Sequence, residues 1–319
     1  MKPNNSYSQK MEKYPFLSST MEITNHNWTA DIRPLVSIDC NAYMHENYIQ
    51  EAIQGLLMQR TNFKVEILIH DDASTDKTPD IIKYYANRYP NLIKATLQIE
   101  NQYNKNPKTS NYVKPYPKVG KYIARCEGDD YWTDKYKLQK QVDFLEKNPD
   151  YVVAYHDAII VDTNGNIISK SKMHNKSKKD YSKEELIKGN TFILTMSRVH
   201  RNIKLNIPPE VRNVVNRDNF FTSLLGHYGK GKYFSCIKPA VYRDHGNGIW
   251  SSLDQKQKNL SKIRTYYWMY RYYKRINEKE YAINFLHKIN NLLKTKCISE
   301  ADVVEILNFG TEMLSVDAA

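Results

Sequence analysis

The chain has 319 residues, of which 41% are hydrophobic and 12% aromatic, and 47 Lys and Arg against 35 Asp and Glu leave a formal net charge of +12. This composition excludes an intrinsically disordered chain, because it supplies enough apolar surface for a packed core, and the length suits one large domain with an appendage or two modest domains. The positive charge favours an anionic partner such as a nucleotide, a lipid head group or a nucleic acid.

The cysteines and the N-terminal segment indicate the cellular location to expect. The four cysteines, at positions 40, 126, 236 and 297, are far apart and form neither zinc-site spacing nor a disulfide framework. The N-terminal segment has no apolar stretch of the signal-peptide kind, and no window of the sequence is apolar enough to span a bilayer. We therefore expect a cytoplasmic protein, which could still attach to the inner face of a membrane.

Strands and helices are expected to alternate in the first half of the chain. Residues 1–32 are polar and irregular and are expected to form an N-terminal arm. After the arm, β-rich runs span residues 35–40, 63–70, 92–99 and 120–127, and runs with helical spacing span 45–60, 71–90 and 134–149. This alternation predicts an α/β fold with a mostly parallel sheet flanked by helices.

The second half of the chain is more mixed. Residues 151–169 are typical of a hairpin with an Asn-Gly turn, residues 216–231 of a helix and residues 232–245 of a strand. From about residue 253 the chain is helical, and residues 255–275 carry seven basic and six aromatic side chains with no acidic one. Such a segment can rest on an anionic membrane, form a dimer interface, hold a peptide or stack on nucleic-acid bases.

Polar side chains gather where three of the predicted strands end. They are Asn41 and Tyr43, Asp71 and Asp72, and Asp129 and Asp130. Ligands of parallel sheets bind outside the carboxyl ends of the strands, so these side chains predict a site. Adjacent carboxylates repel each other unless a cation or backbone N–H groups neutralise them, and Mg²⁺ and Mn²⁺ accept such oxygen ligands. The alternative is a solvated turn that also caps the next helix.

Five segments, taken together and in order, resemble the family-2 glycosyltransferases. They are PLVSIDCNAY at 34–43, HDDASTDKTPDII at 70–82, EGDDYW at 127–132, NRDNFF at 216–221 and YRDHGNGIWSS at 242–252. EGDDYW resembles the metal-binding DxD-type motif of the family, and NRDNFF resembles the segment with the catalytic base. The resemblance implies the Rossmann-like GT-A fold and an inverting enzyme that uses a nucleotide-diphospho-sugar and a divalent metal.

The resemblance also implies a role for each matching residue. Asp218 would be the catalytic base, although a helix-start aspartate is the alternative. Asp130 would bind Mn²⁺ or Mg²⁺ at the diphosphate, and His245 would add a contact to the metal or the diphosphate. The donor, a UDP-sugar, would be held by Asn41, Tyr43, Asp72 and Asp129. The sugar or the acceptor would be contacted by Trp132, Arg217 and Trp250, with core packing as the alternative for both tryptophans.

These assignments imply a domain layout and a reaction. The GT-A catalytic domain would span residues 33–252, with a nucleotide-sugar half at 33–132, an acceptor half at 133–252 and a helical extension at 253–319. The reaction would move a hexose or N-acetylhexosamine from a UDP-sugar to a hydroxyl of a bacterial-type surface glycan or lipid-linked saccharide, by metal-assisted direct displacement. A small secreted peptide, modified on Ser, Thr or Cys, is the alternative acceptor.

Functions of other classes are less compatible with the sequence. A P-loop NTPase is excluded because the sequence lacks GxxxxGK[ST], and a nucleotidyltransferase is disfavoured because the turn at 41–48 has no glycine. A nucleic-acid-binding protein that uses the basic aromatic helix stays an alternative. The acidic strand ends favour nucleotide-sugar chemistry over it, so no nucleic-acid partner is expected.

Overall fold

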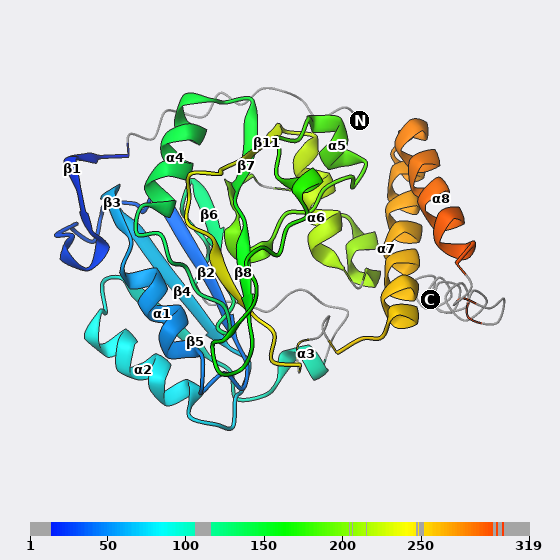
Figure 1. Cartoon of the computed structure of the whole chain (residues 1–319). Helices are drawn as coiled ribbons and strands as arrows, with labels where there is room; N and C mark the ends of the chain where they lie inside the picture. Colours follow the sequence, from blue (N-terminus) through cyan, green and yellow to red (C-terminus); the bar gives the residue numbers. More distant parts are fainter. Residues whose placement is uncertain are drawn as a thin grey trace, which may run out of the picture.

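The computed structural model describes residues 14–105, 116–203, 205, 207–214, 216–246, 248, 252–295, 298 and 302. These residues form a seven-stranded central sheet with helices packed on it, and two smaller sheets of three and two strands (Figure 1).

The central sheet is mostly parallel. Its strands are β2 (Val36–Ala42), β4 (Val65–Asp71), β5 (Ile93–Leu97), β6 (Tyr122–Arg125), β7 (Tyr151–Tyr155), β10 (Val199–Arg201) and β11 (Lys230–Tyr233). They lie in the order β11-β7-β10-β6-β2-β4-β5. β2, β4, β5 and β6 are parallel neighbours, β11 is parallel to β7, and β10 is antiparallel to both of its neighbours. This arrangement confirms the predicted fold class.

Helices follow β2, β4, β5 and β6 in the chain, and all of them except the short one after β5 lie in segments predicted to be helical. They are α1 (Ile49–Leu57), α2 (Thr78–Arg88), α3 (Gln102–Lys105) and α4 (Lys137–Lys147). α1 buries Ile49, Ile53 and Leu56 completely, as its helical spacing predicts, and Pro79 lies in the first turn of α2, where its missing N–H has no helical partner to lose. All seven residues of β4 are buried, because helices cover a parallel sheet on both faces.

The second half of the N-terminal arm is ordered, in contrast to the irregular structure predicted for it. Strand β1 (Phe16–Glu22) pairs antiparallel with β3 (Arg60–Phe63) in the two-stranded sheet. The Phe16 ring packs edge-on against Phe63, and Arg60 forms an ion pair with Glu22. The sequence of β1 lacks regular alternation, so the strand depends on a partner that lies some forty residues away in the chain.

The predicted hairpin forms from the later part of its segment. β8 (Ala158–Val161) and β9 (Ile167–Ser169) pair antiparallel, and Gly165 takes a left-handed φ of 85° in the turn. β12 (Ala240–Arg243) lies parallel to β8 and completes the three-stranded sheet. Residues 151–155 belong to the central sheet instead.

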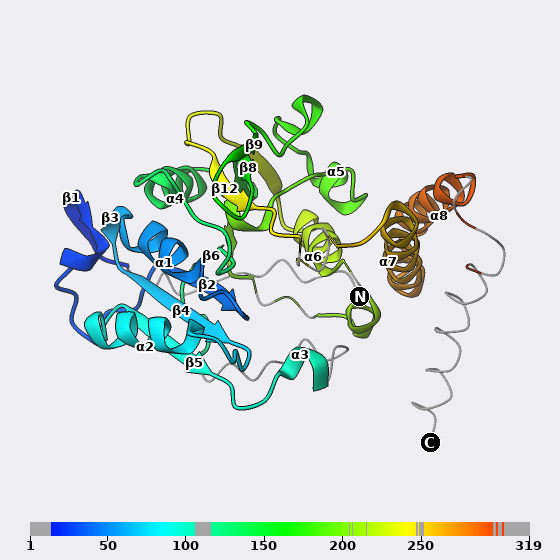
Figure 2. The ribbon, with the colours of Figure 1, turned by 60° about the horizontal axis from the view of Figure 1, so that its bottom comes forward.

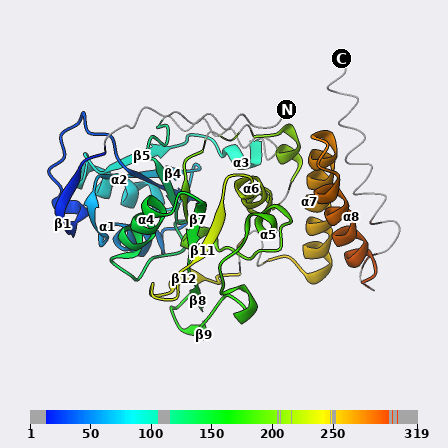
Figure 3. The ribbon, with the colours of Figure 1, turned by 90° about the horizontal axis from the view of Figure 1, so that it is seen from above.

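The C-terminal helices share a core with the second half of the domain. α7 (Gln255–Arg275) and α8 (Lys279–Leu293) lie side by side next to α6 (Arg217–Gly226) in Figures 2 and 3. Trp268, Tyr273 and Phe285 are buried in a cluster with Phe220 of α6. Part of the aromatic content of α7 therefore serves packing, which makes base stacking by this helix less compatible with the structure.

The remaining helix of the second half precedes α6 in the chain. α5 (Lys183–Ile187) packs on α6 and begins with a capping box between Ser182 and Glu185. Over the part of the chain that the structure describes, no helix combines the length and the apolar character needed to cross a bilayer. The domain boundaries drawn from the sequence stay predictions.

Candidate functional site

The loops that follow β2, β4 and β6 are tied together at the carboxyl edge of the central sheet. β2 lies between β6 and β4, so its end is adjacent to both others. The Asp72 N–H donates to the Ala42 carbonyl at 3.0 Å, and the Gly128 N–H donates to the Asn41 carbonyl at 2.8 Å. The three polar strand ends that the sequence singled out are therefore neighbours in space.

The strand end after β4 uses its carboxylates to organise backbone. The two carboxylate oxygens of Asp72 accept from the N–H groups of Gln102 and Tyr103, at 2.8 and 3.0 Å, and so cap the start of α3. Asp71 accepts from the backbone and hydroxyl of Ser74. These bonds tie the loop that carries Asp72 to the start of α3. At Asp71 burial outweighs the bonds from Ser74 and raises the pKa of the carboxyl group.

The strand end after β2 presents an exposed aromatic ring. Tyr43 is 46% exposed, and the next residue, Met44, adopts a left-handed φ of 56°, which is unusual for a side chain of this kind. Asn41 is the second-to-last residue of β2 and is half-buried. The Tyr43 ring is thus available to stack on a planar ligand, whereas Asn41 lies deeper in the edge.

Asp129 meets two histidines from distant parts of the sequence. Its Oδ2 lies 3.2 Å from Nε2 of His245 and 3.8 Å from Nε2 of His45. One ligand atom from each of the three residues lies within 4.8 Å of the other two, a grouping that could hold a metal ion. His45 follows β2, Asp129 follows β6 and His245 follows β12, so the cluster exists only after the sheets assemble.

The electrostatics of this cluster follow from its contacts. Hydrogen bonding to Asp129 raises the pKa of His245, whereas burial lowers the pKa of His45. Burial acts to raise the pKa of Asp129, but the hydrogen bond from His245 and the charge of His45 outweigh it and leave that pKa below its ordinary value. Asp129 is therefore an ionised carboxylate at neutral pH, as a cation ligand must be.

Asp130 points away from this cluster. It is 4% exposed, and its Oδ1 accepts from the Arg243 N–H at 3.1 Å. Burial, together with the negative charges of Asp129 and Glu127, raises its pKa well above the ordinary value. This environment favours a structural role in fastening β12 to the EGDD loop, and a metal role for Asp130 stays a prediction.

Arg243 braces the loop that presents His245. The guanidinium forms an ion pair with Glu51 in the first turn of α1 and donates to the Asp162 carbonyl. It lies over the rings of Tyr48 and Tyr131, at 4.7 and 5.8 Å from their centroids. The sequence analysis missed this residue, because its partners are up to 192 positions away.

Asp218 lies at the start of α6 in contact with a buried arginine. Its carboxylate accepts from Arg198 Nη2 at 2.9 Å and from the Thr195 hydroxyl at 3.0 Å. Arg198 is 3% exposed, whereas the Asp218 side chain is 46% exposed. Burial acts to raise the pKa of Asp218, but the guanidinium groups of Arg198 and Arg125 and the Thr195 hydroxyl together lower it below its ordinary value. Asp218 is therefore ionised at neutral pH and open to a partner.

A short 3-10 helix, η3 (Thr195–Ser197), links the two parts of the site. The Trp132 indole of the EGDDYW segment donates to the Met196 carbonyl, and the Thr195 hydroxyl donates to Asp218. The segment that carries Asp129 is therefore close to Asp218. Glu127 lies within electrostatic range of both aspartates: burial and the negative charges of Asp218 and Asp129 raise its pKa to about 7, against the opposing effect of Arg125. Nothing in the EGDDYW motif indicated this effect on Glu127.

The architecture agrees with comparisons with known proteins. The model of the family described as "Glycosyl transferase family 2" matches residues 40–203, which is just over half of the chain. The chain belongs to glycosyl transferase family 2. The resemblance seen in the sequence is thereby confirmed.

The chain is similar to proteins of known sequence, and its fold is similar to solved structures. Uncharacterized protein Rv1520 of Mycobacterium tuberculosis is 37% identical over 221 residues, which cover 68% of this chain and 61% of that protein. S. aureus TarS 1-349, solved in complex with UDP-GlcNAc, has a TM-score of 0.50 at 16% identity, with 82% of each chain covered. Mannosyltransferase PcManGT from Pyrobaculum calidifontis, solved with GDP-Man and Mn²⁺, has a TM-score of 0.50 at 12% identity, with 95% of this chain and 84% of that chain covered. The structural similarities concern the fold.

The remaining predicted contacts of the glycosyltransferase site differ in their placement. Trp132 is 1% exposed, and its indole donates to the Met196 carbonyl at 2.7 Å while Lys137 Nζ lies 4.2 Å from the ring centroid. This favours the packing alternative for Trp132 over sugar contact. Arg217 is half-buried beside Asp218 at the start of α6. Trp250 lies outside the described residues.

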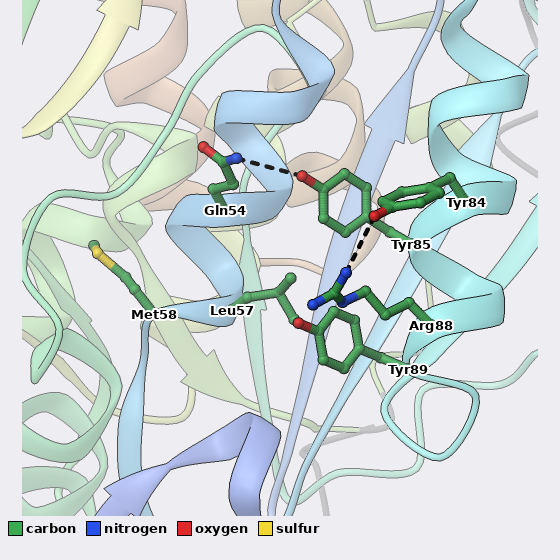
Figure 4. Close-up of a pocket in the computed structure, with 7 residues that line it drawn as sticks. All are labelled: Gln54, Leu57, Met58, Tyr84, Tyr85, Arg88 and Tyr89. Atoms are coloured by element: carbon green, nitrogen blue, oxygen red, sulfur yellow. Dashed lines mark hydrogen bonds between the residues drawn. The ribbon is translucent and has the colours of Figure 1, made fainter.

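A pocket of about 350 Å³ lies elsewhere on this glycosyltransferase, between α1 and α2 (Figure 4). It is lined by Gln54, Leu57, Met58, Tyr84, Tyr85, Arg88 and Tyr89. These residues lie in the later turns of the two helices, just before β3 and β5 begin. The pocket is therefore on the helix layer, toward the amino ends of the strands, and is separate from the edge that carries Asp129.

The cluster at Asp129 fits a divalent cation. It offers one ionised carboxylate oxygen and two imidazole nitrogens, which are donors that first-row metals accept. Its open side faces the carboxyl edge of the sheet, where the phosphates of a nucleotide would add further oxygen ligands.

Proposed function

We propose that the chain transfers a hexose or N-acetylhexosamine from a nucleoside-diphosphate sugar, with UDP-sugars as the first candidate, to a hydroxyl group with inversion at the anomeric carbon. The observation that carries this proposal is the link through η3: the Trp132 indole donates to the Met196 carbonyl and the Thr195 hydroxyl donates to Asp218. This link brings the segment that carries Asp129 close to the ionised, exposed carboxylate of Asp218. Membership of glycosyl transferase family 2 supports it.

The donor would bind at the carboxyl edge of the central sheet. We assign the base and ribose to Asn41, Tyr43 and Asp72, because the Tyr43 ring is exposed for stacking and Asp72 fixes the neighbouring loop. TarS 1-349 was solved with UDP-GlcNAc and PcManGT with GDP-Man, so related folds accept both nucleotides. Uracil is proposed from the resemblance of the strand ends, and guanine is the alternative that the experiment below includes.

The metal would be held by Asp129 and His245, with Mn²⁺ or Mg²⁺ as the candidates. A divalent cation at the diphosphate stabilises the charge that develops on the leaving group. Asp129 suits this role because the neighbouring histidines keep it ionised, and His245 suits it because its Nε2 points at the same carboxylate. Asp130, predicted from the resemblance, stays the alternative carboxylate ligand; we propose Asp129 first because Asp130 Oδ1 accepts from the Arg243 N–H of β12.

Asp218 would take the proton of the attacking hydroxyl. Its carboxylate is exposed on one side and held on the other by Arg198 and Thr195, so its orientation is set before the acceptor arrives. As the new glycosidic bond forms, the proton passes from the hydroxyl oxygen to Asp218, and the nucleoside diphosphate departs from the opposite face of the sugar. A single displacement of this kind inverts the anomeric configuration.

The acceptor is proposed to be a bacterial-type surface glycan or a lipid-linked saccharide, with a small peptide as the alternative. Asp218 begins α6, and α6 shares its core with α7, so the C-terminal helices lie close to the acceptor half of the site. Lys274 at the end of α7 is exposed and positively charged, whereas Arg275 beside it forms an ion pair with Glu210. We propose a cytoplasmic protein whose residues 253–319 contact an anionic membrane or form a homodimer. Contact with the membrane surface would bring a lipid-linked acceptor close to Asp218.

The first test is thermal unfolding with UDP, GDP and CDP, each with and without Mn²⁺. We expect a stabilisation by UDP that requires Mn²⁺ and is lost in Asp129→Asn, because the variant removes the charged ligand. Asp80→Asn is the matched control, since Asp80 is an exposed aspartate on α2. Nucleotides that stabilise would then be offered as sugar conjugates, with the product identified by mass spectrometry. No stabilisation by any of the three nucleotides would contradict the proposed function.

A further inference from the structure

We infer that His45 is a third protein ligand of the metal, and that two imidazoles and one carboxylate make this site prefer Mn²⁺ to Mg²⁺. This inference rests on the proposed function, because it takes the metal to lie at Asp129. The sequence analysis gave His45 no role, and the metal assignment proposed above needs only Asp129 and His245.

The three ligand atoms have the spacing that one ion requires. An ion about 2.1 Å from each ligand atom separates neighbouring ligand atoms by about 3 Å and opposite ones by about 4.2 Å. The two histidine nitrogens lie 3.2 and 3.8 Å from the same Asp129 oxygen, and all three atoms lie within 4.8 Å of one another. The two imidazole rings meet edge to face with their centroids 6.4 Å apart, so both can direct Nε2 at one point.

The backbone holds His45 in place without help from Asp129. Its N–H donates to the Thr78 hydroxyl at 2.8 Å, and its carbonyl accepts from the N–H groups of Tyr48 and Ile49 at the start of α1. The adjacent Glu46 N–H donates to Asp76 at 3.0 Å. The β2–α1 loop is therefore fastened to the start of α2 on both sides of His45, and the imidazole is presented from a rigid support.

The two nitrogens of His45 differ in their surroundings. Nδ1 is buried and has no hydrogen-bond partner among the described residues. It faces Gly128, where a Cβ atom would lie 2.9 Å from it. Nε2 points to Asp129 instead. Glycine at position 128 lets the imidazole come close to the EGDD loop (residues 127–130). Because Nδ1 is buried against this loop, Nε2 is the nitrogen that an ion can reach, and Nδ1 would then carry the ring proton.

The kinds of ligand atom determine the preference between Mn²⁺ and Mg²⁺. Mg²⁺ is a hard cation that takes oxygen ligands in octahedral geometry and releases water reluctantly. Imidazole nitrogen is a better ligand for first-row transition ions, and a second imidazole therefore disfavours Mg²⁺ more than Mn²⁺. Removing His45 should lower affinity for Mn²⁺ and narrow the difference between the two ions.

The direct test counts the nitrogen ligands of Mn²⁺. Pulsed electron paramagnetic resonance of the wild-type protein with Mn²⁺ and UDP should show couplings to two imidazole nitrogens, and to one in His45→Gln and in His245→Gln. His287→Gln, an exposed histidine on α8, is the control and should leave both couplings in place. The number of nitrogen ligands in the wild-type protein is measured without any variant, so this result is valid even if a substitution impairs folding.

Calorimetric titration of UDP in the presence of Mn²⁺ or Mg²⁺ gives the second readout. We expect His45→Gln to weaken Mn²⁺-dependent binding by about tenfold or more, in the range seen when groups that support a metal are removed, with a smaller effect in Mg²⁺. A single nitrogen in the wild type, with UDP and Mn²⁺ bound, would overturn the role of His45 and leave the proposed function intact. Wild-type protein that binds neither Mn²⁺ nor UDP would contradict both.

Discussion

Replacement of Asp218 by asparagine tests the proposed base independently of the donor and metal sites. Asparagine has the shape of aspartate and keeps an oxygen that can accept from the Thr195 hydroxyl, but it cannot take a proton from the acceptor. Asp218 is not among the residues grouped at Asp129, which are His45, Asp129 and His245. The substitution should therefore leave donor and metal binding in place and remove the proton acceptor.

The expected loss of rate is large and the expected loss of stability is small. A positioned general base contributes about two to four orders of magnitude in rate, which is about 3–5 kcal/mol of activation free energy. Breaking a fully buried ion pair costs about 3–5 kcal/mol. The Asp218 side chain is 46% exposed, so solvent screens its pair with Arg198 and we expect a loss of about 1 kcal/mol. That corresponds to a decrease in Tm of about 2–4 °C.

The assay compares turnover with binding in the same preparation. Sugar transfer is followed by mass spectrometry at saturating donor, and UDP binding with Mn²⁺ is followed by calorimetry. Asp218→Asn should lose at least about 100-fold in kcat while the Kd for UDP changes less than about twofold. Transfer at the wild-type rate would refute the assignment of the base. A parallel loss of UDP binding would show that Asp218 contributes to the donor site instead.

Three further substitutions test the surroundings of the site and the C-terminal core. Arg198→Gln removes the main charge that lowers the pKa of Asp218, so the acid limb of the pH–rate profile should move to higher pH. In the wild type, the stabilisation from this ion pair is lost as pH falls through the lowered pKa, and in the variant this pH-dependent part of the stability should be smaller. An unchanged acid limb would exclude Asp218 as its source. Gly128→Ala places a Cβ 2.9 Å from His45 Nδ1 and should cost about 1–3 kcal/mol and weaken Mn²⁺-dependent UDP binding, as measured by denaturation and calorimetry. Phe285→Ala should cost about 3–5 kcal/mol in urea unfolding, because the ring is completely buried in the core shared with α6; a loss below about 1 kcal/mol would mean that the C-terminal helices contribute little to stability.

Much of the fold and the location of the site could be predicted from local sequence patterns. The strands β5 and β6 and the helices α1, α2 and α4 lie within the predicted segments, and β2 and β4 run past theirs by two residues and one residue, because apolar spacing records which face is buried better than where an element ends. The carboxyl edge follows from the parallel strands of the sheet, since those strands end on the same side. β1 was not predicted, because an edge strand with a mixed pattern depends on its partner.

The roles of individual carboxylates could not be predicted, because Asp129 and Asp130 have the same neighbours in the chain but different neighbours in space. Asp129 meets two histidines that lie 84 positions before it and 116 positions after it, whereas Asp130 turns toward the backbone of β12. Burial and nearby charge, which decide the pKa of each group, are properties of the assembled site.

A mostly parallel α/β domain with an acidic edge follows from the amino-acid sequence alone, because hydrophobic period and motif order are encoded locally. Tertiary contacts are needed to link Asp218 to the EGDDYW segment through Thr195 and Met196, to pair Arg198 with Asp218 and to bring His45 and His245 to Asp129. Coulombic and hydrogen-bond contacts act over a few ångströms, and distances of this kind between residues far apart in the chain are set when the strands pair and the helices pack.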